Sequence, residues 1–283
     1  MPSQVSLKQL LETGVHFGHR TQKWNPKMAP FIFTQRNGIH IIDLRQTIEY
    51  LNRYHDMVRD IVANGGTVLF VGTKRQAQDT IAREAERCGM PYVNQRWLGG
   101  TLTNWRTIRD RIDTLKKLEG RRDRGEFELL TKREGVMLNR EIEKLQLRLG
   151  GIRTMKRLPD IIVVVDTVRE QTAVKEANIL NIPTLALVDT NSDPDEIDHL
   201  IPANDDAMRS IRVIISAIAD AVIEGRNLRA SIAEEDEEDA DAMDQVDLDR
   251  YDDEEGDDEQ YLGASTLRKL RDTKLFDEDE DED

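Results

Sequence analysis

The stretch NQRWLGGTLTNW, residues 94–105, marks the point where the character of the chain changes. A short apolar segment precedes it, and a long charged segment with regularly spaced leucines and isoleucines follows it. The pair Gly99 and Gly100 allows the backbone to turn sharply or to approach another backbone closely. Thr103 or Asn104 can cap a helix that starts directly afterwards. The stretch therefore predicts a joint between two regions of different architecture.

Two helices with one apolar seam each are predicted after this joint. Apolar side chains recur every three or four residues in two runs, which a polar turn around residues 120–125 separates. Heptad-like spacing of this kind is typical of helices that pack along a single stripe. We expect residues 105–150 to form an antiparallel coiled-coil helical hairpin that projects from the rest of the protein. The seam residues are Ile108, Ile112, Leu115 and Leu118 in the first helix and Leu138, Ile142, Leu145 and Leu149 in the second.

Apolar runs of strand length alternate with helical patterns on both sides of the hairpin. The strands expected to be buried are Thr67–Val71, Ile161–Val165 and Thr184–Val188, with a short strand at Pro91–Val93. Continuous apolar strands that alternate with helices favour an α/β fold, here a Rossmann-like parallel sheet with helices on both faces. The predicted helices are Arg45–Asn64, Arg75–Cys88, Arg169–Leu180 and Asp205–Arg226.

Nearer the N-terminus, the dipeptide Asn37–Gly38 lies between the apolar segments Phe31–Arg36 and Ile39–Asp43. Asn-Gly between two strand patterns is typical of a two-residue β-hairpin turn, in which both residues take positive φ angles. We therefore expect a β-hairpin in this region, in addition to the main sheet.

The charge of the chain is strongly segregated. The net charge of −15 argues against a nucleic-acid-binding protein. However, the negative charge comes from residues 230–283, which contain 25 acidic and 5 basic residues, and the rest of the chain is slightly basic. Within residues 94–157 there are 17 Lys and Arg against 9 Asp and Glu. A concentrated basic block of this kind is expected of a phosphate-binding surface.

This composition also divides the chain into domains. We predict an α/β sheet domain made of residues 1–104 and 151–229, a hairpin of residues 105–150, and an acidic tail of residues 230–283. The tail has too few apolar residues to bury a core, so we expect it to be disordered, apart from a short helix within Thr266–Phe276.

Several classes of protein and of site are disfavoured. The single cysteine, Cys88, cannot form an internal disulfide and fits a reducing compartment, and no signal peptide or membrane-spanning run is visible, so we expect a cytoplasmic protein. The loop of residues 71–76 contains a single glycine, so it matches neither a Walker A loop nor the G-x-G-x-x-G fingerprint of dinucleotide-binding proteins. No catalytic serine or zinc-protease motif is found. A nucleotide-binding α/β enzyme and a coiled-coil adaptor that binds only proteins remain as alternatives.

Basic and aromatic residues in several places are predicted to bind RNA. Arg and Lys hold phosphates, and Trp can stack on unpaired bases. For each Trp a place in the core is the alternative, and for the loop around residue 74 an ordinary strand-to-helix turn. The candidate RNA-binding residues are Arg20, Lys23, Trp24, Lys27, Arg36, Lys74, Arg75, Arg96, Trp97, Arg106, Arg109, Arg153, Lys156 and Arg157.

Carboxylates and imidazoles near the end of the strand Thr184–Val188 suggest a divalent cation, Mg²⁺ or Zn²⁺. Asx-turns and helix caps would explain the same Asp residues without a metal. No other cofactor is expected. The candidate ligands are His16, His19, Asp189, Asp193 and Asp205.

Five segments resemble, in the same order, the bacterial small-subunit ribosomal protein two family. They are Gly14–His19 running on to Trp24–Met28, Phe70–Lys74, Asn94–Trp105, Leu158–Asp160 and Pro183–Pro194, and the resemblance extends from about residue 3 to about residue 228. It implies a Rossmann-like sheet with a projecting helical hairpin.

The resemblance also implies a function. Members of this family are structural constituents of the small subunit that bind its rRNA between head and body, without catalysis, membrane or small-molecule substrate. In bacteria they help to recruit the large ribosomal protein one, which delivers mRNA. The acidic tail lies outside the resemblance, and we hypothesise that it shields the basic surface before assembly.

Overall fold

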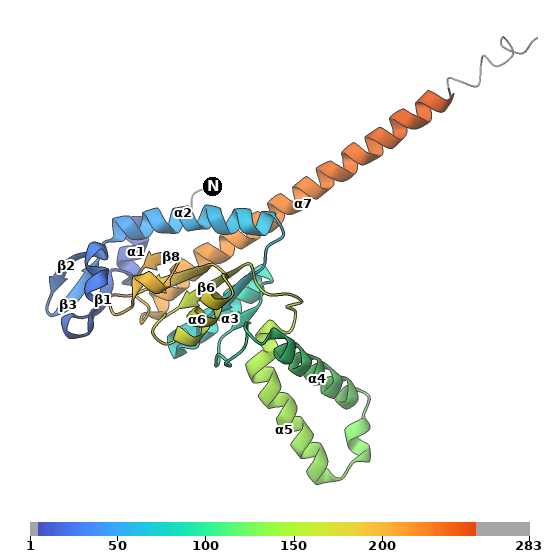
Figure 1. Cartoon of the computed structure of the whole chain (residues 1–283), viewed down its shortest axis with the longest axis horizontal. Coiled ribbons are helices and arrows are strands. Elements are labelled where there is room, and N and C mark those ends of the chain that lie inside the picture. Colours follow the sequence, from blue (N-terminus) through green and yellow to red (C-terminus); the bar gives the residue numbers. More distant parts are fainter. Residues whose placement is uncertain (1–4, 253–283) are drawn as a thin grey trace, which may run out of the picture. The chain divides into compact units, whose positions relative to one another are not determined.

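The structure of the protein is a computed structural model that describes residues 5–252 of the chain (Figure 1). The chain divides into two compact units, Met1–Arg229 and Ala230–Asp283. The first unit contains the sheets and the helical hairpin, and both are described within that unit.

The centre of the first unit is a five-stranded parallel sheet in the order β5-β4-β6-β7-β8. All residues of β4, β6 and β7 are buried, as expected for strands covered on both faces. The Rossmann-like α/β architecture predicted from the sequence is therefore present. The strands are β4 (Val68–Val71), β5 (Tyr92–Val93), β6 (Ile161–Val165), β7 (Thr184–Val188) and β8 (His199–Pro202).

Alternate side chains of these strands form two cores, one on each face of the sheet. Phe70 and Val163 belong to the core shared with α2, α3 and α7. Leu69 and Val164 belong to the other, shared with α6 and the inner end of the hairpin. The helices are α2 (Leu44–Ala63), α3 (Arg75–Cys88), α6 (Gln171–Ile179) and α7 (Met208–Asp252).

A second, antiparallel sheet in the order β1-β3-β2 follows the short helix α1 (Leu7–Thr13). Asn37 and Gly38 have φ angles of 53° and 73°, which confirms the predicted hairpin turn. The strands are β1 (Phe17–Arg20), β2 (Ile32–Arg36) and β3 (Ile39–Ile42), with short 3-10 turns η1 (Thr21–Lys23) and η2 (Pro26–Phe31) between β1 and β2. Strand β1 was not predicted.

Two antiparallel helices, α4 (Trp105–Asp123) and α5 (Lys132–Leu149), form the hairpin and are joined through η3 (Glu126–Leu129) (Figure 1). The predicted seam divides into two parts. At the outer end Leu115, Leu118 and Ile142 form a separate small core between the helices. The inner seam residues Ile108, Ile112 and Leu149 instead pack into the core of the sheet. Coiled-coil packing over the whole hairpin stays a prediction.

Helix α7 differs from the sequence prediction at its C-terminal end. It continues to Asp252, although residues from 230 onward were expected to be disordered. Acidic residues are compatible with a helix when the helix extends one that is already formed, because nucleation is the costly step. Residues 253–283, and the short helix predicted at Thr266–Phe276, lie outside the described residues.

Candidate nucleic-acid interface

The joint at residues 94–105 is fixed by a single buried carboxylate, that of Glu176 on α6. One oxygen, Oε1, accepts hydrogen bonds from Trp97 Nε1 at 3.0 Å and from the Gly100 amide at 2.8 Å. The other, Oε2, accepts from the Leu102 amide at 2.9 Å and from the amide and hydroxyl of Thr103, both at 3.2 Å. Five donors on one carboxylate hold the loop in one conformation and leave none of these groups without a partner.

This arrangement keeps Glu176 ionised. Burial opposes the charge, but the hydrogen bonds from Trp97 and from the amides of Leu102, Gly100 and Thr103 outweigh it, so that the pKa of Glu176 lies below its usual value. The side chain of Trp97 is 8% exposed and packs in the core. The prediction that Trp97 binds RNA is therefore corrected: its ring is buried, and its N–H is committed to Glu176.

The other end of the hairpin reaches the sheet through an unusually close contact. A Cβ on Gly151, in the turn η4 (Gly150–Ile152), would lie 2.2 Å from the carbonyl oxygen of Tyr92 on β5. Only glycine allows this approach. We expect Gly151→Ala to lower the free energy of unfolding by about 2 kcal/mol, because one backbone must move away from the other. Chemical denaturation measures the loss, and Gly99→Ala, where a Cβ meets nothing within 4 Å, is the matched control.

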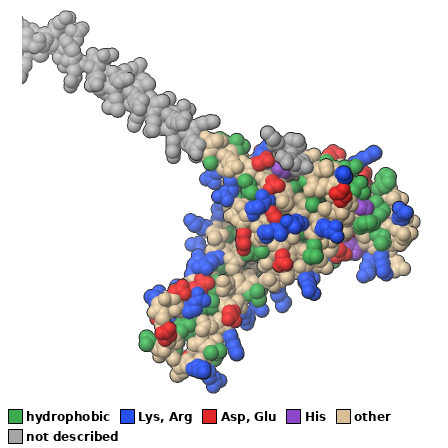
Figure 2. All heavy atoms as spheres, turned by 180° about the vertical axis from the view of Figure 1, so that it is seen from behind, with side chains coloured by type: hydrophobic (Ala, Val, Ile, Leu, Met, Phe, Trp, Pro, Cys, Tyr) green, Lys and Arg blue, Asp and Glu red, His purple; other side chains and the backbone are tan. Residues whose placement is uncertain are grey.

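Cationic side chains surround the root of the hairpin, the region where residues 94–105 and 150–157 connect its two helices to the sheet. Arg96, Arg106, Arg109 and Lys156 are exposed, and none of them has an ion-pair partner among the side chains of residues 5–232. Figure 2 shows Lys and Arg side chains spread over one face of the body and of the hairpin. Cations without protein partners keep their full charge available for phosphate groups.

Two further predicted cations at the root are partly engaged within the protein. Arg153 pairs with Glu119 at 2.9 Å. Arg157 donates to the Gly65 carbonyl at 2.9 Å and pairs with Asp160 at 3.2 Å. Arg153 and Arg157 remain exposed. A surface ion pair of this kind is weak, so both guanidinium groups retain the capacity to contact an anion.

The predicted residues of the N-terminal loop divide into free and engaged groups. Arg20, Lys23 and Arg36 are exposed and have no ion pair within the described part of the chain. Trp24 is 36% exposed, with its ring 4.9 Å from the ring of His40. Lys27 lies within 2.8 Å of Asp193 and 2.6 Å of Asp195. Hydrogen bonds to these carboxylates raise the pKa of Lys27, so it stays protonated. The two negative charges compensate its positive charge, which leaves less of it to attract RNA.

Lys74 is a clear departure from the sequence prediction. Its ammonium nitrogen Nζ lies 2.8 Å from Asp205, 3.2 Å from Asp166 and 2.5 Å from Asp206, and the residue is 9% exposed. The prediction that Lys74 binds an RNA phosphate is corrected, since three carboxylates already enclose the cation. Its neighbour Arg75 is exposed and keeps that possibility.

This enclosure also bears on the alternative of a nucleotide-binding enzyme. The carboxylates of Asp166, Asp189, Asp205 and Asp206 lie at the edge of the sheet where α/β folds bind nucleotides, and they would repel an incoming phosphate.

The five predicted metal ligands do not form one group. His19 and Asp205 lie together with Asp206, with one ligand atom of each within 4.8 Å of the others. Asp189 touches this group through His19 Nδ1 at 3.0 Å. The other two predicted ligands are placed elsewhere: the ring of His16 lies 4.1 Å from that of Phe17, and Asp193 pairs with Lys27.

Two residues that determine this geometry gave no sequence signal: Glu176, whose carboxylate holds the joint, and Asp166, which contacts Lys74. Asp206, which completes the group around Lys74, follows the predicted ligand Asp205 at the start of a helical pattern, where acidic residues commonly stabilise a helix N-terminus.

Comparison with known proteins adds the family. A family model described as Ribosomal protein S2 matches residues 10–225. The small ribosomal subunit protein uS2c of Cyanophora paradoxa is 56% identical over 230 residues, which cover 81% of this chain and 99% of that relative. None of the described helices is both long and apolar enough to span a membrane. The chain therefore belongs to the ribosomal protein S2 family, and it is a structural protein of the ribosome and not an enzyme.

Proposed function

We propose that this protein binds small-subunit rRNA through the exposed cations at the root of the hairpin and in the N-terminal loop. The observation that carries the proposal is a set of exposed cations around a joint that Glu176 and Gly151 hold in place. These cations, which form no ion pair with any side chain that the structure describes, are Arg96, Arg106, Arg109 and Lys156. A surface of fixed shape with free cations favours the phosphates of a folded RNA, which proteins recognise largely by shape.

Charge reversal at the root tests this proposal. We expect Arg106→Glu combined with Arg109→Glu to weaken binding to small-subunit rRNA by at least about 10-fold at moderate salt, and to reduce the dependence of log K on log salt by roughly 1.5, because each phosphate contact contributes about 0.7 to 0.9. Filter binding across a salt series measures both values.

The matched control places the same change on the opposite face of the sheet. Arg45 and Arg53 on α2 are also exposed, and α2 packs on the core that does not contain the hairpin. Arg45→Glu with Arg53→Glu should change the affinity by less than about 3-fold, a change typical of long-range charge alone. Equal losses in the two double variants would contradict a specific surface at the root.

Assembly of the small subunit and recruitment of ribosomal protein one are the finer part of the proposal, together with a place on cytoplasmic ribosomes. They rest on family membership. Small subunits depleted of this chain should lose ribosomal protein one on sedimentation and regain it when the purified chain is added. An adaptor that binds only proteins would stay in its complexes after RNase treatment, whereas the proposed RNA-bound protein would be released.

We also propose that His19, Asp205 and Asp206 can take up a divalent cation. Imidazole and carboxylate together suit Zn²⁺, and carboxylates suit Mg²⁺. The nearby ammonium of Lys74 already compensates the same carboxylates, so that occupancy should be partial. Elemental analysis of the dialysed protein should find less than one ion per chain and a lower value in Asp206→Asn. Equal content in the two proteins would contradict this site.

A further inference from the structure

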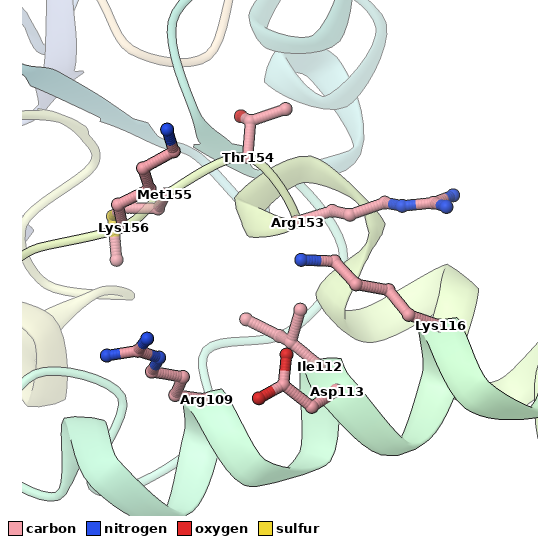
Figure 3. A pocket seen from close by; sticks show the side chains of 8 residues that line it. All are labelled: Arg109, Ile112, Asp113, Lys116, Arg153, Thr154, Met155 and Lys156. Atoms are coloured by element: carbon pink, nitrogen blue, oxygen red, sulfur yellow. The ribbon is translucent and has the colours of Figure 1, made fainter.

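A cleft of about 540 Å³ lies at the root of the hairpin, between α4 and the segment of residues 153–156 that leads toward β6 (Figure 3). This volume is in the range of sites that hold small organic molecules. Ile112 and Met155 lie at its floor and are 2% and 7% exposed, so they contribute only a small apolar surface. In Figure 3 the side chain of Ile112 points from α4 into the space that faces Met155.

Charged side chains form the rest of the lining. Arg109, Lys116, Arg153 and Lys156 bring four cations, and Asp113 brings one carboxylate. Arg153 is held by Glu119, at 2.9 Å, from outside the lining. Asp113 is exposed and has no ion-pair partner within the described residues, although four cations line the same cleft. Its carboxylate is therefore free to accept hydrogen bonds from a ligand.

An apolar surface, cations and one free acceptor together match the parts of a nucleotide. The base packs over the apolar floor and against the aliphatic stems of the cationic side chains, and its phosphates contact the cationic ends. A carboxylate prefers guanine among the four bases, because guanine offers two adjacent N–H donors, at N1 and at the exocyclic N2, on one edge. Adenine offers an acceptor at its N1 position, and the pyrimidines offer one donor group beside an acceptor.

Two neighbouring hollows extend the same surface. Each has a volume of about 350 Å³, one sharing Arg153 with the cleft and the other sharing Thr154, Met155 and Lys156. They adjoin the cleft along the segment of residues 153–156 and offer room for the nucleotides that precede and follow a bound one. Unpaired nucleotides, whose bases can be splayed out, fit such adjoining hollows, whereas a duplex does not.

We propose that this cleft binds one unpaired guanosine nucleotide of an RNA, with Ile112 and Met155 against the base, Asp113 accepting from its N1–H and N2–H groups, and Arg109, Lys116 and Lys156 on the adjacent phosphates. The proposal rests on the proposed function and goes beyond it, because it assigns a base preference to a surface that would otherwise read only charge and shape.

The test uses the full chain and fluorescently labelled RNA pentamers, AAGAA and AAAAA, in anisotropy titrations. We expect the wild-type protein to bind the guanosine oligomer at least about 10-fold more tightly, the scale of discrimination that a good bidentate contact to a base provides. Asp113→Ala should abolish this preference and weaken binding of AAGAA to the level of AAAAA.

The sign of the Asp113 effect separates the two explanations. Removal of a negative charge strengthens the binding of any polyanion to a purely electrostatic surface. Asp110→Ala on the same exposed part of α4, outside the cleft, is the matched control and should preserve the preference for guanosine. Lys156→Ala should weaken the binding of AAGAA and of AAAAA by similar factors, because it removes a phosphate contact and not a base contact.

Salt-dependent binding without a guanosine preference, or tighter binding of AAGAA by Asp113→Ala, would overturn this inference and leave the proposed function standing. Absence of salt-dependent binding to either pentamer and to small-subunit rRNA would overturn both. Circular dichroism of each variant establishes that the exposed substitutions leave the fold intact.

Discussion

Replacement of Glu176 by alanine is expected to lower the free energy of unfolding of the body by about 3 to 5 kcal/mol, the range seen when one partner of a buried charged network is removed. The substitution leaves the indole N–H of Trp97 and three backbone amides without their acceptor. These donors lie in or beside the core, where water does not readily replace the carboxylate. Urea unfolding followed by tryptophan fluorescence measures the loss.

The pH dependence gives a second test of the same residue. Because the pKa of Glu176 is lowered in the folded protein, its contribution is complete above the usual glutamate pKa and is lost as the pH falls through the lowered value. The gap in stability between the wild type and Glu176→Ala should therefore be largest near pH 7 and shrink below about pH 4. Lys175→Ala, at an exposed position of the same helix, should change stability by less than about 0.5 kcal/mol. A gap that is unchanged at low pH would show that the loss does not come from the carboxylate's charge.

Lys74→Met is expected to cost about 3 kcal/mol or more at neutral pH, because it removes the cation that two buried carboxylates and the exposed Asp206 share. Methionine fills much of the same volume, so the loss reports the charge and not a cavity. Asp205 is fully buried, and Asp166 is 9% exposed, so neither can be solvated well in compensation. Thermal and chemical unfolding of the purified protein measure the effect.

The adjacent residue supplies the control for Lys74. Arg75→Met changes an exposed cation that has no ion pair among the described residues, and it should alter stability by less than about 0.5 kcal/mol. RNA binding should show the opposite order, with Arg75→Met weakening it and Lys74→Met affecting it only through the fold. If Lys74→Met weakened RNA binding without any loss of stability, the structural role of Lys74 would be contradicted.

The sequence predicts local features well where one segment carries the whole signal. Strands β6 and β7 begin and end at the predicted residues, because a nearly continuous apolar run marks a strand that is covered on both faces. Strand β8 was missed, since its His199 and Leu200 are only half-buried at the edge of the sheet and give no continuous pattern. The Asn37–Gly38 turn was predicted from two residues alone.

The sequence says little where function depends on partners far apart in the chain. Glu176 looks like an ordinary surface glutamate of an amphipathic helix, and its partner Trp97 lies 79 residues earlier. Lys74 looks like a free cation at the start of a helix, and its partner Asp205 lies 131 residues later. Whether a charged residue serves the fold or a ligand is decided by such contacts, which no local pattern encodes.

The attachment of the hairpin by Glu176 has a consequence for the order of events during synthesis. Helices α4 and α5 emerge first and can pair through their own small core, but the carboxylate that fastens their root follows only with α6. At this stage of synthesis the nascent chain therefore carries a formed hairpin whose orientation relative to the sheet is not yet fixed. The hairpin takes its final orientation only after α6 has been made, so a chain truncated before residue 176 would present the arginines of the hairpin to RNA in a different orientation.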